Sequence, residues 1–201
     1  MSIIATEVRR QTVTVLFVDI VGFTALIEDL DCAEVRALQM DYFAAVSSVV
    51  RDCGGVVEKY VGDAVMAVFG LSAQCPEEGA AAAVRAGLAV QAALRGRRLG
   101  GRFPVRTRVG LATGDVMVDE AAARDGGFGM VSGSVVSTAA RLQAYAPHDT
   151  VVVCAVTREV TDAAIAYQEL PPVAVAGKPY PLDLWRALHP QAAALPAPAL
   201  C

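Results

Sequence analysis

The sequence predicts an α/β or α+β sandwich, in which helices pack on a mixed β-sheet. Strand-like and helix-like stretches follow one another in the order β-α-α-β-β-α-β-β-α-β-β, in which strands come mostly in pairs. The chain has 201 residues and is 55% hydrophobic, which suits one domain with a substantial core. Two strand-like runs flank Gly62-Asp63, a strong signal for a β-hairpin.

The first half of the chain begins with a predicted central strand over residues 12–18, because this run is apolar and β-branched. The strand ends at Asp19, and the stretch DIVGFT then turns the chain. Asp31 followed by Glu34 forms a capping-box pattern, which predicts the start of a long helix. Apolar residues recur at helical spacing until Gly54-Gly55, where the helix ends.

The middle of the chain contains the hairpin of residues 56–69 and a second long helix. Pro76 with the acidic residues after it predicts the start of that helix, which extends to about Leu99. Residues 105–118 are typical of a strand, a turn at Gly114-Asp115 and another strand. A loop or arm follows over residues 119–129.

The last third of the chain contains a third predicted helix and several strands. The helix covers residues 134–145 and ends before Pro147. Residues 150–154 form a strand, and residues 164–188 suit short strands joined by turns.

Composition and charge limit the possible classes of protein. The net charge of −4 gives no reason to expect a nucleic-acid partner or an acidic membrane surface. Five scattered cysteines without CxxC spacing favour a reduced, cytoplasmic protein over a disulfide scaffold or a zinc site. We find no signal-peptide pattern and no apolar run of the ~18 residues that a membrane span needs.

Two carboxylates are expected at one edge of the sheet. Asp19 ends the first strand and Asp63 lies in the hairpin turn, so they emerge together if these strands are neighbours. Mg²⁺ takes few protein oxygens and completes its shell with water and substrate phosphates, which this pair suits. In the turn after Asp19, the backbone around Gly22, Phe23 and Thr24 can hold a phosphate. A helix-capping role for Asp19 is the alternative.

Four sequence blocks together resemble the catalytic domain of class III nucleotidyl cyclases. These blocks are LFVDIVGFTAL, VEKYVGDAVMAVFG, RVGLATGDV and GMVSGSVVSTAARLQ. The resemblance implies that family's α+β fold, a ferredoxin-like α/β sandwich in which helices pack on a mixed, mostly antiparallel sheet. It also divides the chain into an N-terminal extension (1–11), a catalytic domain (12–188) and a Pro- and Ala-rich flexible tail (189–201).

The resemblance implies a metal and substrate site. Asp19, Asp63 and the carbonyl of Ile20 match the ligands of two Mg²⁺ or Mn²⁺ ions. Lys59, four residues before Asp63, matches the lysine that reads adenine, where guanine-specific relatives tend to have Glu, so ATP is the expected substrate. A solvent-facing strand lysine is the alternative. Arg108 matches the arginine that contacts the phosphates.

Other matched positions depart from the family pattern. Met130 stands where Asp or Thr usually reads the base, and Ser137 stands where an Asn orients the ribose. Arg141 is retained, one helical turn after Ser137, and would stabilise the pentavalent phosphate. The usual Lys before the Gly of AGKPYP is replaced by Ala176, so Lys178 is the candidate substitute, with a solvated loop lysine as the alternative.

In this family the site lies between two domains. The metal aspartates and Arg108 of one chain would meet a second set of residues from the other chain: Lys59, Met130, Ser137 and Arg141. This chain carries both sets, which implies a head-to-tail homodimer with two sites. We expect either an excised catalytic domain, fused or coupled to regulatory domains, or a short stand-alone protein.

Three functions remain open from the sequence. The first is an adenylate cyclase. The second is a degenerate cyclase homology domain that binds nucleotide or only dimerises, which Ser137 and Ala176 favour. The third is a cyclase for GTP or a pyrimidine nucleotide, which Met130 permits and Lys59 disfavours.

Overall fold

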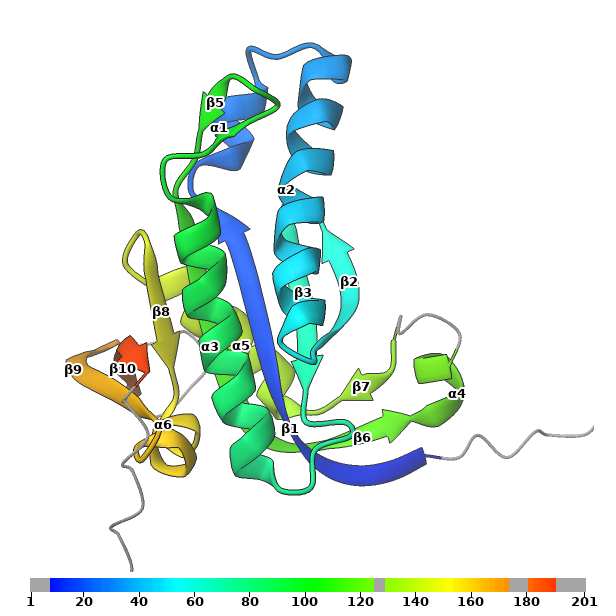
Figure 1. The fold of residues 1–201 in the computed structure, drawn as a ribbon, viewed down its shortest axis with the longest axis vertical. Coiled ribbons are helices and arrows are strands. Elements are labelled where there is room, and N and C mark those ends of the chain that lie inside the picture. Colours follow the sequence, from blue (N-terminus) through cyan, green and yellow to red (C-terminus); the bar gives the residue numbers. More distant parts are fainter. Residues whose placement is uncertain (1–7, 125–128, 174–180, 191–201) are drawn as a thin grey trace, which may run out of the picture.

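The computed structural model describes residues 8–124, 129–173 and 181–190. Its main sheet has the strand order β2-β3-β1-β6-β8-β10-β9, with β7 added beside β6 (Figure 1). All pairs are antiparallel except the parallel pair β6–β8. The strands of this sheet are β1 (Val8–Ile20), β2 (Val56–Val61), β3 (Ala64–Phe69), β6 (Thr107–Asp119), β7 (Val131–Ser132), β8 (Thr150–Val153), β9 (Ile165–Val173) and β10 (Leu182–Pro190).

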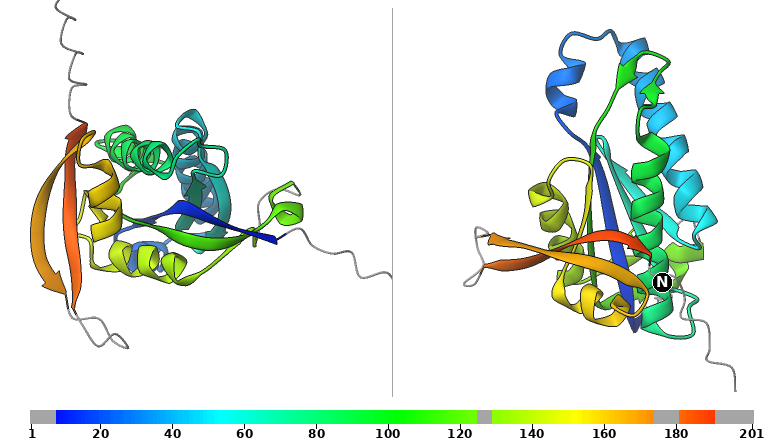
Figure 2. Two further views of the ribbon diagram at one scale, coloured as in Figure 1. Left: turned by 90° about the horizontal axis from the view of Figure 1, so that it is seen from below. Right: turned by 60° about the vertical axis from the view of Figure 1, so that its left-hand side comes forward.

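Helices cover both faces of the sheet, and each face has its own apolar core. Helices α2 (Cys32–Asp52) and α3 (Pro76–Leu94) lie on one face, and α5 (Ser134–Tyr145) lies on the other (Figure 2). Successive side chains of β1 point to opposite faces of the sheet and so enter the two cores in turn. Leu16 and Val18 belong to the core under α2 and α3 (the α2/α3 core), and Val15 and Phe17 belong to the core under α5 (the α5 core). The predicted α+β architecture is therefore confirmed.

Shorter elements complete the fold. The helices α1 (Phe23–Ile27), α4 (Glu120–Arg124) and α6 (Ala155–Thr161) each span at most two turns, and β4 (Arg98–Leu99) and β5 (Phe103–Pro104) form a separate small hairpin. The predicted capping box is present, because Asp31 accepts from the Glu34 N–H and Glu34 accepts from the Asp31 N–H. The predicted turn at Gly62-Asp63 joins β2 to β3.

The turn predicted at Gly114-Asp115 is wrong. Strand β6 runs without a break from Thr107 to Asp119, because β1 is equally long and pairs with it throughout. Within this ladder Asp115 accepts hydrogen bonds from Thr12 Oγ1 at 2.6 Å and from Arg10 Nε at 2.9 Å. The long ladder and these contacts override the local turn preference of a Gly-Asp pair.

Other predicted elements also differ from the structure. Helix α3 ends at Leu94 rather than near Leu99, because Gly96 adopts a positive φ of 73° and leads into the β4–β5 hairpin. The segment expected to be a loop contains α4, and α6 was not predicted. The strands expected to be short are two nine-residue strands, β9 and β10. Of the predicted tail, residues 191–201 lie outside the described part of the chain.

Candidate metal and nucleotide site

The two candidate metal ligands lie together at one end of the sheet. Strand β1 pairs with β3, so the end of β1 meets the β2–β3 turn. The Ile20 N–H donates a hydrogen bond to Asp63 Oδ2 at 3.0 Å. This backbone contact holds the Asp63 carboxylate beside Asp19, the residue before Ile20.

The electrostatics of the pair fit a divalent cation. Burial raises the pKa of Asp63 from its usual 3.8 to about 7, and the hydrogen bond and negative charge of Asp19 add to the rise. A cation between the two groups would relieve this repulsion and favour both charged forms. Two carboxylates supply few protein oxygens, which suits an ion that takes further ligands from phosphates and water.

Asp19 has two hydrogen-bond donors within its own chain. Arg108 Nη2 donates to Asp19 Oδ2 at 2.9 Å, and Gln143 Nε2 donates to the same oxygen at 2.8 Å. Arg108 also donates to the Ala144 carbonyl at 3.2 Å. Arg108 lies opposite Asp19 in the β1–β6 register. These contacts fix the position of Asp19 Oδ2 and so set the orientation of the whole carboxylate, including its other oxygen.

Gln143 was missed by the sequence reasoning, and no local pattern marks it. Its placement depends on how closely α5 approaches β6 at Gly110. A Cβ added to Gly110 would lie 2.1 Å from the Gln143 nitrogen and 2.6 Å from the Ala139 carbonyl oxygen. Only a glycine at this position lets the helix backbone come near enough for Gln143 to reach Asp19.

Tyr42 is a second residue that the sequence reasoning missed. Its side chain is completely buried on α2, and its hydroxyl has no hydrogen-bond partner among the described residues. Burial raises its pKa well above the usual value, and the charges of Asp19 and Asp63 add to the rise. Tyr42 belongs to the α2/α3 core, together with Val18 and Ile20 of β1.

The other candidate site residues are spread over several elements. Lys59 on β2 is half-buried, with Nζ 3.3 Å from Glu58 Oε2. Gly22 has a φ of 71° and precedes α1, in which Phe23 is buried and Thr24 exposed. These three residues of the turn stay predicted phosphate contacts.

Helix α5 presents two candidate residues, and a third, Met130, directly precedes β7. Ser137 is exposed and its hydroxyl donates to the Ser134 carbonyl at 2.9 Å, while Arg141 is half-buried. Met130 is fully buried in the α5 core, so its contact with a nucleobase stays a prediction. Lys178 lies outside the described residues.

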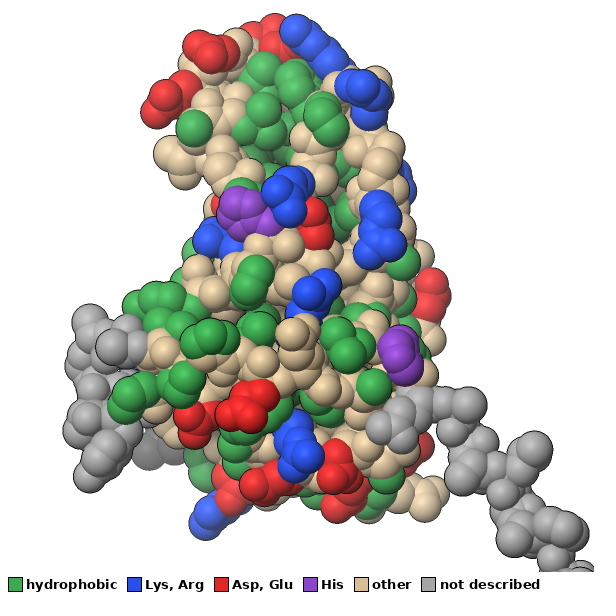
Figure 3. Space-filling view, turned by 90° about the vertical axis from the view of Figure 1, so that its left-hand side faces the viewer, with side chains coloured by type: hydrophobic (Ala, Val, Ile, Leu, Met, Phe, Trp, Pro, Cys, Tyr) green, Lys and Arg blue, Asp and Glu red, His purple; other side chains and the backbone are tan. Residues whose placement is uncertain are grey.

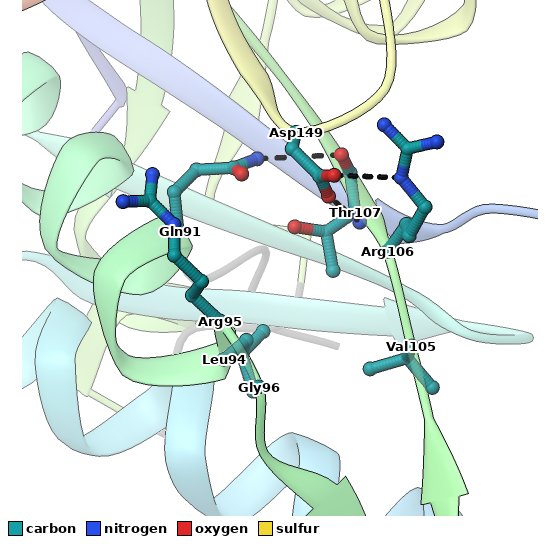
Figure 4. Close-up of a pocket in the computed structure, with 8 residues that line it drawn as sticks. All are labelled: Gln91, Leu94, Arg95, Gly96, Val105, Arg106, Thr107 and Asp149. Atoms are coloured by element: carbon teal, nitrogen blue, oxygen red, sulfur yellow. Dashed lines mark hydrogen bonds and ion pairs between the residues drawn. The ribbon is translucent and has the colours of Figure 1, made fainter.

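A separate cavity of about 190 Å³ lies between the end of α3 and the start of β6 (Figure 4). Arg106 Nε donates to Asp149 Oδ2 at 2.6 Å, and Gln91 Nε2 donates to the Thr107 carbonyl at 3.3 Å. Its polar groups thus bind one another, and neither Asp19 nor Asp63 lines it. On the molecular face in Figure 3, acidic, basic and apolar side chains are interspersed among the coloured residues.

Comparison with known proteins identifies the family. The sequence profile described as adenylate and guanylate cyclase catalytic domain matches residues 6–185, and the chain belongs to this family. An uncharacterised protein of Rhizobium meliloti is 31% identical over 90% of this chain and 18% of its own length. An uncharacterised protein of Mycobacterium tuberculosis is 35% identical over 64% of this chain and 23% of its own. The chain thus spans about a fifth of the length of these relatives.

Solved structures agree with this assignment. The adenylyl cyclase CyaB from P. aeruginosa superposes with a TM-score of 0.79 at 27% identity, over 91% of this chain and 96% of that one. The guanylyl cyclase Cya2 superposes with a TM-score of 0.77 at 25% identity, over 89% and 92% of the two chains. These similarities support the class III cyclase fold that the sequence blocks predicted. In the described part of the chain, no helix has the length and apolar character needed to cross a membrane.

Proposed function

We propose that this domain is an adenylate cyclase that converts ATP to 3′,5′-cyclic AMP and pyrophosphate in cytoplasmic signalling. The observation that carries the proposal is the pairing of Asp19, at the end of β1, with Asp63 in the β2–β3 turn, beside Arg108. When bound, two Mg²⁺ or Mn²⁺ ions would lower the pKa of the ribose 3′-hydroxyl and neutralise the negative charge of the phosphates.

The residues of the chain orient the substrate for one displacement. The ribose 3′-oxygen forms a bond to the α-phosphorus of ATP. The bond between the α-phosphorus and the oxygen that bridges to the β-phosphorus breaks, so that pyrophosphate leaves. The proton of the 3′-hydroxyl passes to solvent water. Asp19, Asp63 and the Ile20 carbonyl hold the metal ions in this proposal, and Arg108 binds the phosphates. Arg141 stabilises the charge that develops on the transferring phosphate.

A homodimer completes the proposed site. In class III cyclases the site lies between two domains, and we propose that a second copy of the chain brings Lys59, Ser137 and Arg141 to the aspartates. The surface beside Lys59 supports this assembly, because Met40, Tyr60 and Val61 leave large apolar side chains 51%, 47% and 58% exposed. Met40 lies on α2, which contacts the β2–β3 turn through Gln39 and Gly62.

The first test measures cyclic nucleotide formation by the purified chain. ATP, GTP, CTP and UTP are offered in parallel, with Mg²⁺ and with Mn²⁺, and the dimer is verified by light scattering. Cyclic AMP above that of an Asp19→Ala blank supports the proposal. No product from any nucleotide in a dimeric sample would favour a regulatory module, and a different cyclic product would favour relaxed base selectivity.

Ser137→Asn is expected to raise kcat by about threefold to tenfold, if positioning of the ribose limits the rate. Asn is longer than Ser and can donate and accept hydrogen bonds, whereas the Ser137 hydroxyl bonds the Ser134 carbonyl of its own helix. Thr138→Asn is the control, because Thr138 is adjacent and its hydroxyl bonds the same carbonyl. An unchanged kcat for Ser137→Asn would contradict the ribose-positioning role.

A further inference from the structure

Glu58 is a buried carboxylate whose burial needs an explanation. Its side chain is completely inaccessible, and neither carboxylate oxygen has a hydrogen-bond partner in the described structure. Burying an unpaired carboxylate is strongly unfavourable. Among the described residues, Lys59 pairs with it, with Nζ 3.3 Å from Glu58 Oε2. The two residues therefore form a pair with one side chain fully buried and one partly exposed.

A β-bulge at Glu58 sets the direction of Lys59. Val57 pairs with Ala67, but Lys59 pairs with the next residue, Met66, so Glu58 is an extra residue in β2. Ala67 belongs to the α2/α3 core and Met66 to the α5 core. Without the bulge, Lys59 would share the face of Val57, since they are two residues apart. The bulge turns Lys59 to the opposite face.

Lys59 thereby lies on the same face of the sheet as Asp19 of its own chain. In the proposed homodimer, this face would bring Lys59 to the aspartates of the partner. Met66 pairs with Phe17 on β1, and Asp19 is two residues beyond Phe17, on the same face of the sheet. The next residue of β2 is anchored on the other face, where the Tyr60 hydroxyl lies 2.8 Å from Ser47 Oγ of α2. The backbone of β2 after the bulge is thus anchored through Tyr60, by a contact that does not involve Lys59.

We propose that Glu58 is a positioning residue that holds the Lys59 ammonium in the orientation that reads the nucleobase. An ammonium has three donors, so one can engage Glu58 while another meets a ring nitrogen of adenine. A lysine side chain otherwise has many rotamers, and a buried counter-charge reduces that freedom before substrate binds. Glu58 sets base selectivity without touching the base. This inference rests on the proposed function of Lys59.

The first test replaces the charge and keeps the shape. Glu58→Gln is expected to lower kcat/KM for ATP about tenfold, mainly through KM, because a charge-assisted contact to Lys59 is lost. The kcat/KM for GTP should stay the same, so the ratio of kcat/KM for ATP to that for GTP should fall. Glu159→Gln is the matched control, because it makes the same chemical change at an exposed position of α6. An unchanged ATP/GTP ratio in Glu58→Gln would overturn the inference.

A second test measures the pair in the folded protein. Lys59→Met should lower Tm by about 10 °C, because it leaves a buried carboxylate without its counter-charge. Adding Glu58→Gln to Lys59→Met should restore most of that loss. Additive Tm shifts in this double-mutant cycle would show that the two residues do not act as a pair, and would overturn the inference.

Failure of the proposed function is separable from failure of this inference. Binding of fluorescent mant-ATP and mant-GTP measures base selectivity without turnover. If the wild type forms no cyclic nucleotide but binds mant-ATP more tightly, and Glu58→Gln removes that preference, the cyclase proposal fails and the role of Glu58 stands. If the wild type forms cyclic AMP and Glu58→Gln keeps the binding preference, the role of Glu58 fails.

Discussion

Replacing Asp19 by Ala is expected to lower kcat at least about a thousandfold, because metal-ion stabilisation of phosphoryl transfer is worth several kcal/mol. The loss should appear with Mg²⁺ and with Mn²⁺. The same variant should bind Mn²⁺ more weakly, which electron paramagnetic resonance of the free ion measures without turnover. The two readouts together separate a metal ligand from a residue that only shapes the site.

The fold should survive this substitution. Asp19→Ala removes the acceptor of Arg108 and Gln143, which is unfavourable, but it also removes the negative charge that raises the pKa of Asp63. These effects oppose each other. Asp115→Ala is the matched control, because Asp115 also lies on a paired strand and accepts from an arginine, Arg10. Full activity and unchanged Mn²⁺ binding in Asp19→Ala would contradict the metal assignment.

Gly110→Ala is expected to destabilise the fold by about 3 kcal/mol, which urea unfolding measures. The new methyl group would lie 2.1 Å from the Gln143 nitrogen and 2.6 Å from the Ala139 carbonyl oxygen. Both atoms belong to the backbone of α5, so no side-chain rotation relieves the clash. The helix must move away from β6, and Gln143 then loses its reach to Asp19.

Gly114→Ala provides the control on the same strand. A Cβ at Gly114 would lie 3.5 Å from Val135 Cγ2, an ordinary van der Waals distance, so the free energy of unfolding should change by no more than about 0.5 kcal/mol. Activity should be retained in Gly114→Ala and reduced in Gly110→Ala. Equal destabilisation by both substitutions would show that the approach of α5 at Gly110 is not specially close.

The aspartate pair shows what could be predicted from local pattern. Asp19 follows an apolar β-branched run, and Asp63 lies in a Gly-Asp turn between two such runs, so each position is marked by a few neighbouring residues. Their closeness then requires only that β1 and β3 be neighbours in one sheet. Gly114-Asp115 carries the same dipeptide signal as the hairpin turn, yet it lies inside a continuous strand, because a long partner strand outweighs local preference.

Helices packed on a mixed sheet, the hairpin, the capped helix and the two carboxylates could be predicted from sequence patterns, because each depends on periodicity or on residues a few positions apart. The groups that surround those carboxylates could be found only in the folded structure. Gln143 reaches Asp19 across 124 positions of sequence, through a glycine on a third element. Glu58 faces Lys59 because a bulge changes the side on which β2 presents its residues. Contacts of this kind depend on strand register and on the distance between helix and sheet, which no short stretch of sequence encodes.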